Sequence, residues 1–171
     1  MALRREARGA AWKLYIEAVS DVANPGLIRP PLVYVASILL GALLQLAAPA
    51  AFLPPRVFNA AIGASLVVVA MALFVSAAGR FRAAGTALPA NRPTTAIVRT
   101  GPFRFSRNPI YLAFTLLQLG IAIWVNSLWI LATLMASVAL MHIVIAREER
   151  YLERKFGAEY VAYKSSVRRW L

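Results

Sequence analysis

Two segments in the second half of the chain carry residues that could bind a charged ligand. The first is residues 79–109, which contains six arginines and no acidic residue and whose glycines and prolines predict a loop. Guanidinium groups bind carboxylates and phosphates, so this loop could bind an anion. A simpler explanation is that the arginines contact anionic lipid headgroups, as basic loops beside membranes do. The six are Arg80, Arg82, Arg92, Arg99, Arg104 and Arg107.

The end of this loop has the pattern of a helix start. Asn108 is a favourable N-cap residue and Pro109 suits the first helical position, so we expect the Asn108 side chain to cap a helix. The free N–H groups at a helix N-terminus attract negative groups. Because Arg104, Arg107 and Tyr111 lie beside this start, an anionic part of a ligand could bind here, although capping alone also explains the Asn-Pro pair.

An acidic pair forms the second segment. Glu148 and Glu149 lie close behind a long stretch without charged residues. A partly desolvated carboxylate in such a place is stabilised by a cationic ligand and costs stability without one. The alternative is a solvated helix with ion pairs, because Glu149 and Glu153 are four residues apart and share a helical face.

The elements that position these residues are membrane helices. The chain of 171 residues is 60% hydrophobic and 15% charged, whereas soluble proteins have roughly 45–50% and 25%. Residues 32–51 and 57–78 carry no charge and are long enough to span a bilayer, which takes about 20 residues. Residues 110–146 are also uncharged, and the polar pair Asn126-Ser127 divides them into two helices, 110–125 and 128–146. We therefore predict an all-α polytopic membrane protein with four transmembrane helices.

The predicted organisation is one structural domain of five segments, with interfacial helices at both ends. Basic residues, 19 against seven acidic ones, concentrate outside the uncharged stretches, which predicts that both termini and the central loop are cytoplasmic. The segments are an interfacial N-terminal segment (1–31), a first transmembrane hairpin (32–78), a basic cytoplasmic loop (79–109), a second transmembrane hairpin (110–146) and a C-terminal cytoplasmic or interfacial helix (147–171).

The composition also excludes several kinds of site. The chain has no cysteine and one histidine, so we expect no disulfide and no metal centre. Its basic residues lie between long apolar stretches, so the expected partner is the lipid bilayer and not nucleic acid. We expect His142, inside the last predicted span, to hydrogen-bond to Gln118 of the helix before it.

The two charged segments together resemble the isoprenylcysteine carboxyl methyltransferase and phospholipid methyltransferase superfamily of membrane enzymes. The similarity covers about residues 85–171, and many relatives have histidine at the position of Asn108 and proline at that of Arg168. It is carried by Gly101-Pro102-Phe103-Arg104-Phe105-Ser106-Arg107-Asn108-Pro109-Ile110-Tyr111, and by Glu148-Glu149, Tyr151-Leu152, Phe156-Gly157, Tyr160, Tyr163, Val167 and Arg168.

This resemblance implies S-adenosylmethionine as the methyl donor, bound at the cytoplasmic surface between the two segments. The implied acceptor is lipid-linked or hydrophobic, either a carboxylate of the prenylcysteine type or a lipid amine. The resemblance identifies no catalytic residue, and Arg104 and Arg154 are the candidates for that role. The implied donor-binding residues are Gly101, Arg107, Asn108, Pro109, Tyr111, Glu148 and Glu149.

Two other functions fit the sequence. Sterol reductases are similar in the C-terminal region, so the chain could be a membrane reductase that uses a nicotinamide cofactor. Alternatively, it is a non-catalytic four-helix membrane protein whose basic loop and interfacial tail bind anionic lipid or a partner.

Overall fold

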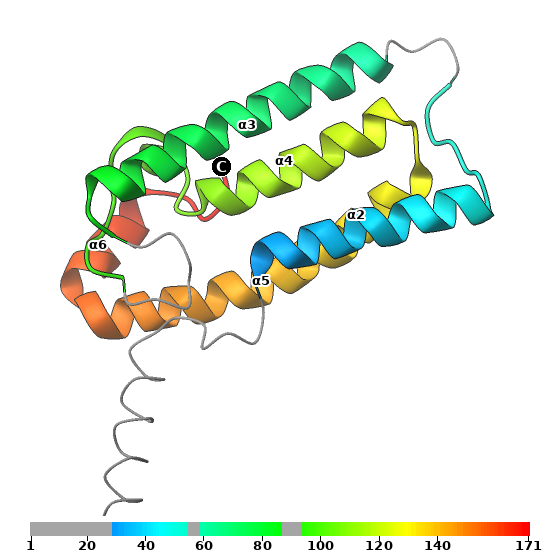
Figure 1. The fold of residues 1–171 in the computed structure, drawn as a ribbon. Helices are drawn as coiled ribbons and strands as arrows, with labels where there is room; N and C mark the ends of the chain where they lie inside the picture. The colour runs from blue at the N-terminus through cyan, green and yellow to red at the C-terminus, as the bar shows by residue number, and fades with distance from the viewer. Residues whose placement is uncertain (1–28, 55–58, 87–93) are drawn as a thin grey trace, which may run out of the picture.

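A computed structural model describes residues 29–54, 59–86 and 94–171, and its regular elements in these ranges are helices (Figure 1). Most of the predicted N-terminal interfacial segment, residues 1–28, lies outside the described residues. The helices are α2 (Pro30–Ala47), α3 (Asn59–Ala83), the short 3-10 helix η1 (Gly101–Arg104), α4 (Pro109–Trp124), α5 (Leu128–Phe156) and α6 (Ala158–Ser166).

Four apolar helices form where the uncharged stretches predict them. In the described part of the chain, α2, α3 and α5 are long and apolar enough to cross a membrane. Helix α4 has 16 residues and is about 24 Å long at 1.5 Å per residue. Helix α5 continues beyond the expected boundary at residue 146 to Phe156, because no helix-breaking residue precedes Gly157, whose φ is 54°. Its last ten residues therefore extend past the apolar stretch.

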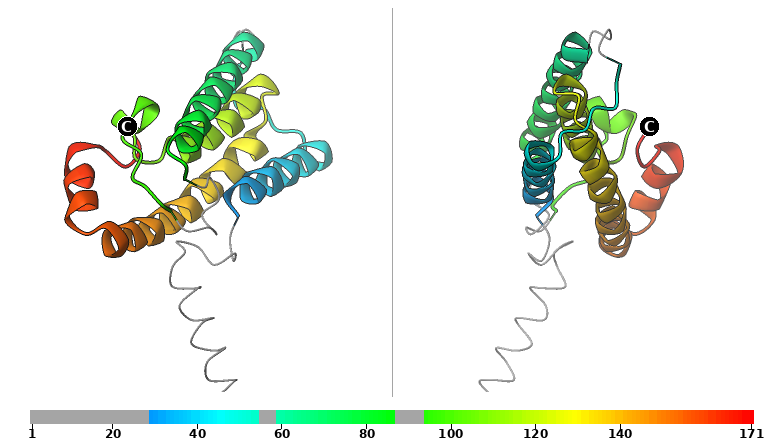
Figure 2. Two further views of the ribbon diagram at one scale, coloured as in Figure 1. Left: turned by 60° about the vertical axis from the view of Figure 1, so that its left-hand side comes forward. Right: turned by 90° about the vertical axis from the view of Figure 1, so that its right-hand side faces the viewer.

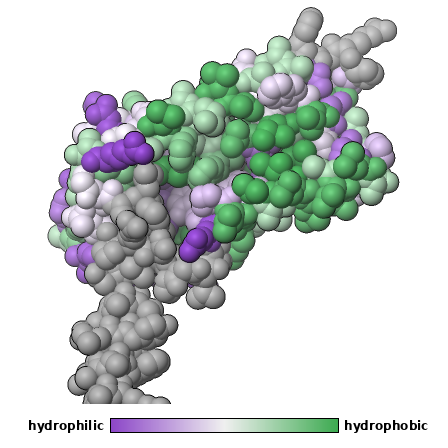
Figure 3. Space-filling model, viewed as in Figure 1, coloured by the Kyte–Doolittle hydropathy of each residue, from purple (hydrophilic) through white to green (hydrophobic). Residues whose placement is uncertain are grey.

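The four long helices form two pairs joined through α4. Helix α3 packs along α4, and α2 packs along α5, while α4 also contacts α5. Figure 1 shows α4 between α3 on one side and α2 with α5 on the other. Helices α2 and α3, which were expected to form the first hairpin, therefore pack mainly against different helices, α5 and α4. The surface over α2 and α3 is strongly hydrophobic, as Figure 3 shows, which suits contact with lipid.

Glycines allow the helices to approach closely. A Cβ atom at Gly63 of α3 would lie 2.5 Å from the Trp124 nitrogen and 2.6 Å from the Gly120 carbonyl oxygen of α4. A Cβ atom at Gly41 of α2 would lie 2.7 Å from the Cα atom of Ile130 in α5. Small residues at helix crossings are typical of membrane proteins, where close packing replaces the hydrophobic effect between helices.

The polar side chains inside the bundle hydrogen-bond to one another. Gln118, which is fully buried, accepts a hydrogen bond from Ser37 at 2.8 Å and donates to the carbonyl oxygen of Ile130 and the hydroxyl of Thr133. The expected bond between His142 and Gln118 is therefore wrong. His142 lies farther along α5 with an exposed side chain, and its Nε2 atom is 3.1 Å from Nη1 of Arg169.

One end of the bundle is closed by neutral groups, and we call it the neutral end. The turn between α4 and α5 places Asn126 at a φ of 50°, and its side chain hydrogen-bonds to the backbone of Phe52 and Leu53. Ser127 caps α5 and donates to Gln45 of α2 at 2.9 Å. The predicted break at Asn126-Ser127 is confirmed, and it joins the turn between α4 and α5 to the segment after α2.

Candidate functional site

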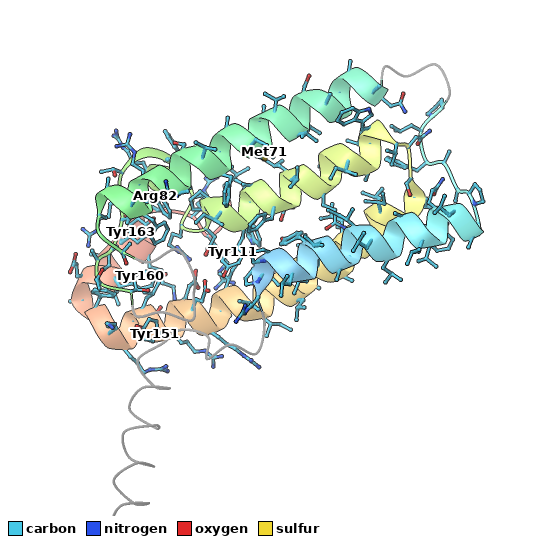
Figure 4. All side chains as sticks on the ribbon, viewed as in Figure 1. Met71, Arg82, Tyr111, Tyr151, Tyr160 and Tyr163 are labelled. Atoms are coloured by element: carbon cyan, nitrogen blue, oxygen red, sulfur yellow. The ribbon has the colours of Figure 1, made fainter. Side chains whose placement is uncertain are left out.

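The two charged segments found in the sequence meet at the opposite end of the bundle, which we call the basic end. The Arg107 guanidinium lies 2.7 Å from a carboxylate oxygen of Glu149, although the two residues are 42 positions apart. The Tyr111 hydroxyl lies 2.6 Å from Oε1 of Glu148. The start of α4 and the last turns of α5 therefore face each other here. Figure 4 labels Tyr111 of α4 and Tyr160 of α6, which both lie at this end.

Glu149 is the centre of a buried ion cluster. Arg107 donates to its Oε1 through Nε and Nη2, and Arg169 donates to both oxygens through Nε and Nη2. The Glu149 and Arg107 side chains are only 4% and 8% exposed. Burial alone would raise the pKa of the Glu149 carboxyl, but the hydrogen bonds and charges of Arg169 and Arg107 outweigh it and lower that pKa below its ordinary value. Glu149 is therefore held ionised between two guanidinium groups.

This cluster fixes the C-terminal segment against the start of α4. The backbone N–H of Arg107 donates to the carbonyl oxygen of Arg168 at 2.9 Å, and Arg107 Nη1 donates to the carbonyl oxygens of Lys164 and Val167. The extended backbone after α6 allows this pairing, since Val167 has a φ of −128°. Figure 2 shows the chain returning from α6 to the segment that precedes α4.

Helix α6 is anchored by two tyrosines, so that the C-terminal segment begins in a fixed place. Tyr160 and Tyr163 are buried, and the Tyr163 hydroxyl donates to the carbonyl oxygen of Phe103 in η1 at 2.8 Å. Burial raises the pKa of Tyr163 to about 12, although the nearby charges of Arg107 and Arg99 lower it. This hydroxyl is therefore a hydrogen-bond donor at neutral pH and not an acid.

Asn108 does not cap α4 with its side chain, contrary to the expectation. It occupies the N-cap position and Pro109 follows at the first helical position, but the side chain makes no capping hydrogen bond. Instead, Asn108 Nδ2 donates to the carbonyl oxygen of Arg169 at 3.0 Å. The C-terminal segment competes for this side chain because it runs directly beside the helix start.

The adjacent carboxylates have separate partners because neighbouring helical positions point about 100° apart. Glu149 faces the two arginines, whereas Glu148 is half-buried and accepts from Tyr111 of α4. Both oxygens of Glu149 are occupied, but the hydrogen bonds described for Glu148 involve only Oε1. Glu148 is therefore the better placed of the two for binding a further group.

The remaining candidates lie around this junction. Gly101 starts η1 with a φ of 61°, and a Cβ atom there would lie 2.8 Å from Nε of Arg80. Pro109 is fully buried at the start of α4. Arg104 and Arg154 have exposed side chains and form no ion pair with other residues in the described ranges. The structure thus brings Arg107, Tyr111, Glu148 and Glu149 together and leaves the two catalytic candidates at the surface.

The sequence analysis did not identify Arg169 as a residue of the site. In the structure its guanidinium donates to both carboxylate oxygens of Glu149. It is one of seven basic residues in 147–171, and it reaches Glu149 only because the backbone turns back after Gly157. The available signal was weak, because the basic pair Arg168-Arg169 follows the acidic pair Glu148-Glu149 only after a separation of 18 residues (150–167).

Comparisons with known proteins give one family match and one relative. The sequence profile of the phospholipid methyltransferase family matches residues 58–159, more than half of the chain. The matched region contains α3, η1, α4, α5 and the start of α6, and so includes both segments of the junction except Arg169. An uncharacterized protein of Haemophilus influenzae is 46% identical over 63 residues, which is 36% of this chain and the whole of that protein.

Proposed function

Because the chain belongs to the phospholipid methyltransferase family, we propose that it transfers a methyl group from S-adenosylmethionine to a lipid-linked or otherwise hydrophobic acceptor at a membrane surface. The observation that carries the proposal is the junction at the basic end. There Arg107 and Tyr111 at the start of α4 contact Glu149 and Glu148 near the end of α5. In a bundle of apolar helices, such polar groups at one end support a binding site next to the bilayer.

The described residues fit the charges of S-adenosylmethionine. The donor carries an ammonium, a carboxylate and ribose hydroxyls, and its sulfonium supplies the methyl group. Glu148, with Oε1 on the Tyr111 hydroxyl and its side chain half-buried, can accept from an ammonium or a hydroxyl. The exposed guanidinium of Arg104 can bind the carboxylate. Arg107 and Glu149 hold the two helices in register and so set the position of Glu148.

Methyl transfer is a displacement in line with the bond that breaks, so it mainly requires alignment of the two substrates and exclusion of water. The packed C-terminal segment supports this requirement, because Trp170 lies against the buried cluster that contains Tyr111 and Met141. A carboxylate acceptor needs no base. A protonated amine must first lose a proton, which water can accept.

The binding of the donor is tested by isothermal titration of the purified protein with S-adenosylmethionine, S-adenosylhomocysteine and NADPH. We expect the first two to bind and NADPH not to bind. Binding of NADPH alone would identify a nicotinamide-dependent reductase, and binding of none of the three would favour a non-catalytic lipid-binding protein.

The role of Glu148 is tested in the same titration with Glu148→Gln and with Glu153→Gln as the matched control. Glu153 lies on the same helix but pairs with Lys164 of α6 instead of Tyr111. Loss of a charge-assisted hydrogen bond should weaken donor binding about tenfold or more in Glu148→Gln, since such bonds contribute roughly 1.5–3 kcal/mol. Equal affinities in both variants would remove Glu148 from the donor site.

We further propose that the basic end faces the cytoplasm, in line with its excess of arginine and lysine. The chain has no cysteine, so single cysteines can be introduced at Ala158 of α6 and at Ala51 near the neutral end, both exposed. A membrane-impermeant thiol reagent should label Ala51→Cys in intact cells and Ala158→Cys only after permeabilisation. The opposite pattern would reverse the orientation.

A further inference from the structure

His142 contacts the residue that attaches the C-terminal segment to the bundle. Its Nε2 atom lies 3.1 Å from Nη1 of Arg169, while Nε and Nη2 of the same guanidinium donate to Glu149. His142 and Glu149 are seven residues apart, which is about two helical turns, so they lie on one face of α5. Arg169 therefore bridges two positions on that face.

The contact with Arg169 requires a neutral imidazole. A guanidinium has only hydrogen-bond donors, so Nε2 of His142 is the acceptor and the ring hydrogen is on Nδ1. Protonation of Nε2 removes this hydrogen bond and places two cations at hydrogen-bond distance. Two guanidinium groups and the Glu149 carboxylate have a net charge of +1, and an imidazolium at His142 raises it to +2. Protonation therefore creates repulsion directed at Arg169.

The other charged groups in this region offer little compensation. Helix α5 packs against α2, α4 and α6, and its residues 138–146 contain no other charged side chain. Glu149 is already shared by two guanidinium groups and Glu148 accepts from Tyr111, so an imidazolium would compete for carboxylates that have partners. The charged and titratable residues at this end are Arg29 and Tyr34 of α2 and its start, Arg107 and Tyr111 at the start of α4, Arg147, Glu148 and Glu149 of α5, Tyr160 of α6, and Arg168 and Arg169 after it.

The attachments of the C-terminal segment converge on Arg169. Its carbonyl oxygen accepts from the Asn108 amide at 3.0 Å, and the carbonyl oxygen of the preceding Arg168 accepts from the backbone N–H of Arg107 at 2.9 Å. The next residue, Trp170, packs against the buried cluster of the bundle. Because these contacts involve three successive residues, displacement of the Arg169 side chain weakens all of them together.

We propose that His142 is a pH-sensitive latch for the C-terminal segment. Neutral His142 holds Arg169 against α5, and protonated His142 releases Arg169 and with it the segment beside the start of α4. Histidine ordinarily changes its charge between about pH 5 and 8, so the closed segment is kept at the upper end of this range and lost as the pH falls. A further consequence rests on the proposed function: release of the segment opens the junction that binds the donor, and so weakens donor binding.

The movement is tested by pulsed electron spin resonance distance measurements on the full chain in lipid nanodiscs. The chain has no cysteine, so spin labels can be attached at Val125→Cys near the neutral end and Arg168→Cys in the C-terminal segment, both exposed. We expect a narrow distance distribution at about pH 8 and a broad one at about pH 5.5. The control pair, Val125→Cys with Ala158→Cys of α6, should stay narrow at both pH values. An unchanged distribution for the first pair, or equal broadening of both pairs, would refute the latch.

Substitutions of His142 separate its protonation from that of other groups. His142→Gln keeps an acceptor for Arg169 but cannot be protonated, so the first pair of labels should give a narrow distribution at both pH values. His142→Arg places a permanent cation beside Arg169, so the distribution should be broad even at about pH 8. The His142 side chain is exposed, so neither variant alters buried packing. Acid broadening that persists in His142→Gln would assign the movement to another group, such as Glu148, and a narrow distribution in His142→Arg would also overturn the proposal.

The consequence for donor binding is measured separately, by isothermal titration with S-adenosylmethionine at the same two pH values. On acidification the affinity should fall about fivefold further in the wild-type protein than in His142→Gln, which is within the usual range of coupling between two sites. Equal losses in both proteins would refute the link between the latch and donor binding. If the wild-type protein binds no S-adenosylmethionine at either pH, the proposed function fails, whereas the distance measurements still decide whether the latch exists.

Discussion

The two ends of the helix bundle are closed by different chemistry. At the neutral end, amides and hydroxyls of Asn126, Ser127 and Gln45 hydrogen-bond to each other and to the backbone. At the basic end, Glu149 lies between two guanidinium groups, and the C-terminal segment is attached to the same cluster. Neutral hydrogen bonds are enough to join helices. Buried charges are costlier, and their retention at one end supports the proposal that the binding site lies there.

This difference also separates the two carboxylates of the basic end. Glu149 has two cationic partners and is satisfied by the protein itself, whereas Glu148 has one hydroxyl partner. We therefore expect Glu149 to determine mainly the stability of the junction and Glu148 mainly the affinity for the donor.

The largest expected effect is the loss of the buried ion cluster. Glu149→Gln leaves Arg107 buried without its counter-ion, which should lower the free energy of unfolding by about 3–5 kcal/mol. Glu159→Gln is the matched control, because Glu159 pairs with Arg99 at the surface, with both side chains at least 44% exposed. It should cost less than about 1 kcal/mol. Thermal unfolding in detergent measures both, and similar melting temperatures would show that the basic end does not depend on the cluster.

The next effect concerns helix packing near the neutral end. Gly63→Ala places a Cβ atom within 2.6 Å of the backbone of α4 at Gly120 and Trp124, so it should cost about 1–3 kcal/mol through overpacking. Gly79→Ala on the same helix meets nothing within 4 Å and should instead stabilise by up to about 1 kcal/mol. Opposite signs in thermal unfolding are the expected result, and a neutral Gly63→Ala would contradict the close approach.

The apolar helices could be located from the sequence because their signal is local. Uncharged stretches predicted the positions of α2, α3 and α4, and Asn126-Ser127 marked a break that the structure contains. The pairing of α2 with α5 could not be predicted, because lipid-facing and helix-facing positions are equally apolar and differ mainly in size. Helix was predicted over 147–171, but its continuity with the last span was missed, because a change from apolar to charged residues ends a span without ending a helix. The predicted C-terminal helix is instead divided at Gly157.

At the site, the sequence predicted that the two charged segments lie together but not how their side chains pair. The resemblance placed Arg107 and Tyr111 with Glu148 and Glu149, and the structure brings these four together. The role of Asn108 was misjudged because its neighbour in space is the carbonyl of Arg169, 61 residues away. Such a contact depends on how the chain folds back in space, so the residues next to Asn108 in the sequence do not indicate it.

A moderate effect should follow from Asn126 at the neutral end. Asn126→Ala loses the hydrogen bonds to Phe52 and Leu53 and also places alanine at a φ of 50°, which costs about 1–2 kcal/mol. Asn126→Gly loses the same hydrogen bonds but tolerates this φ, so it should be the more stable variant by about 1 kcal/mol. Titration with S-adenosylmethionine should give the wild-type affinity for both variants. A loss of affinity beyond the loss of stability would mean that the two ends are coupled.

The smallest effect distinguishes two roles of Asn108. If its side chain only capped α4, Asn108→Ser would be close to wild type and Asn108→Ala would cost about 1 kcal/mol. In the structure the amide donates to the carbonyl oxygen of Arg169, and neither serine nor aspartate supplies that amide donor. We therefore expect Ser, Asp and Ala at this position each to lose about 0.5–1.5 kcal/mol, the net contribution of one hydrogen bond. Melting temperatures for the three variants decide between the roles: a wild-type value for Asn108→Ser alone would restore the cap and detach the C-terminal segment from this residue.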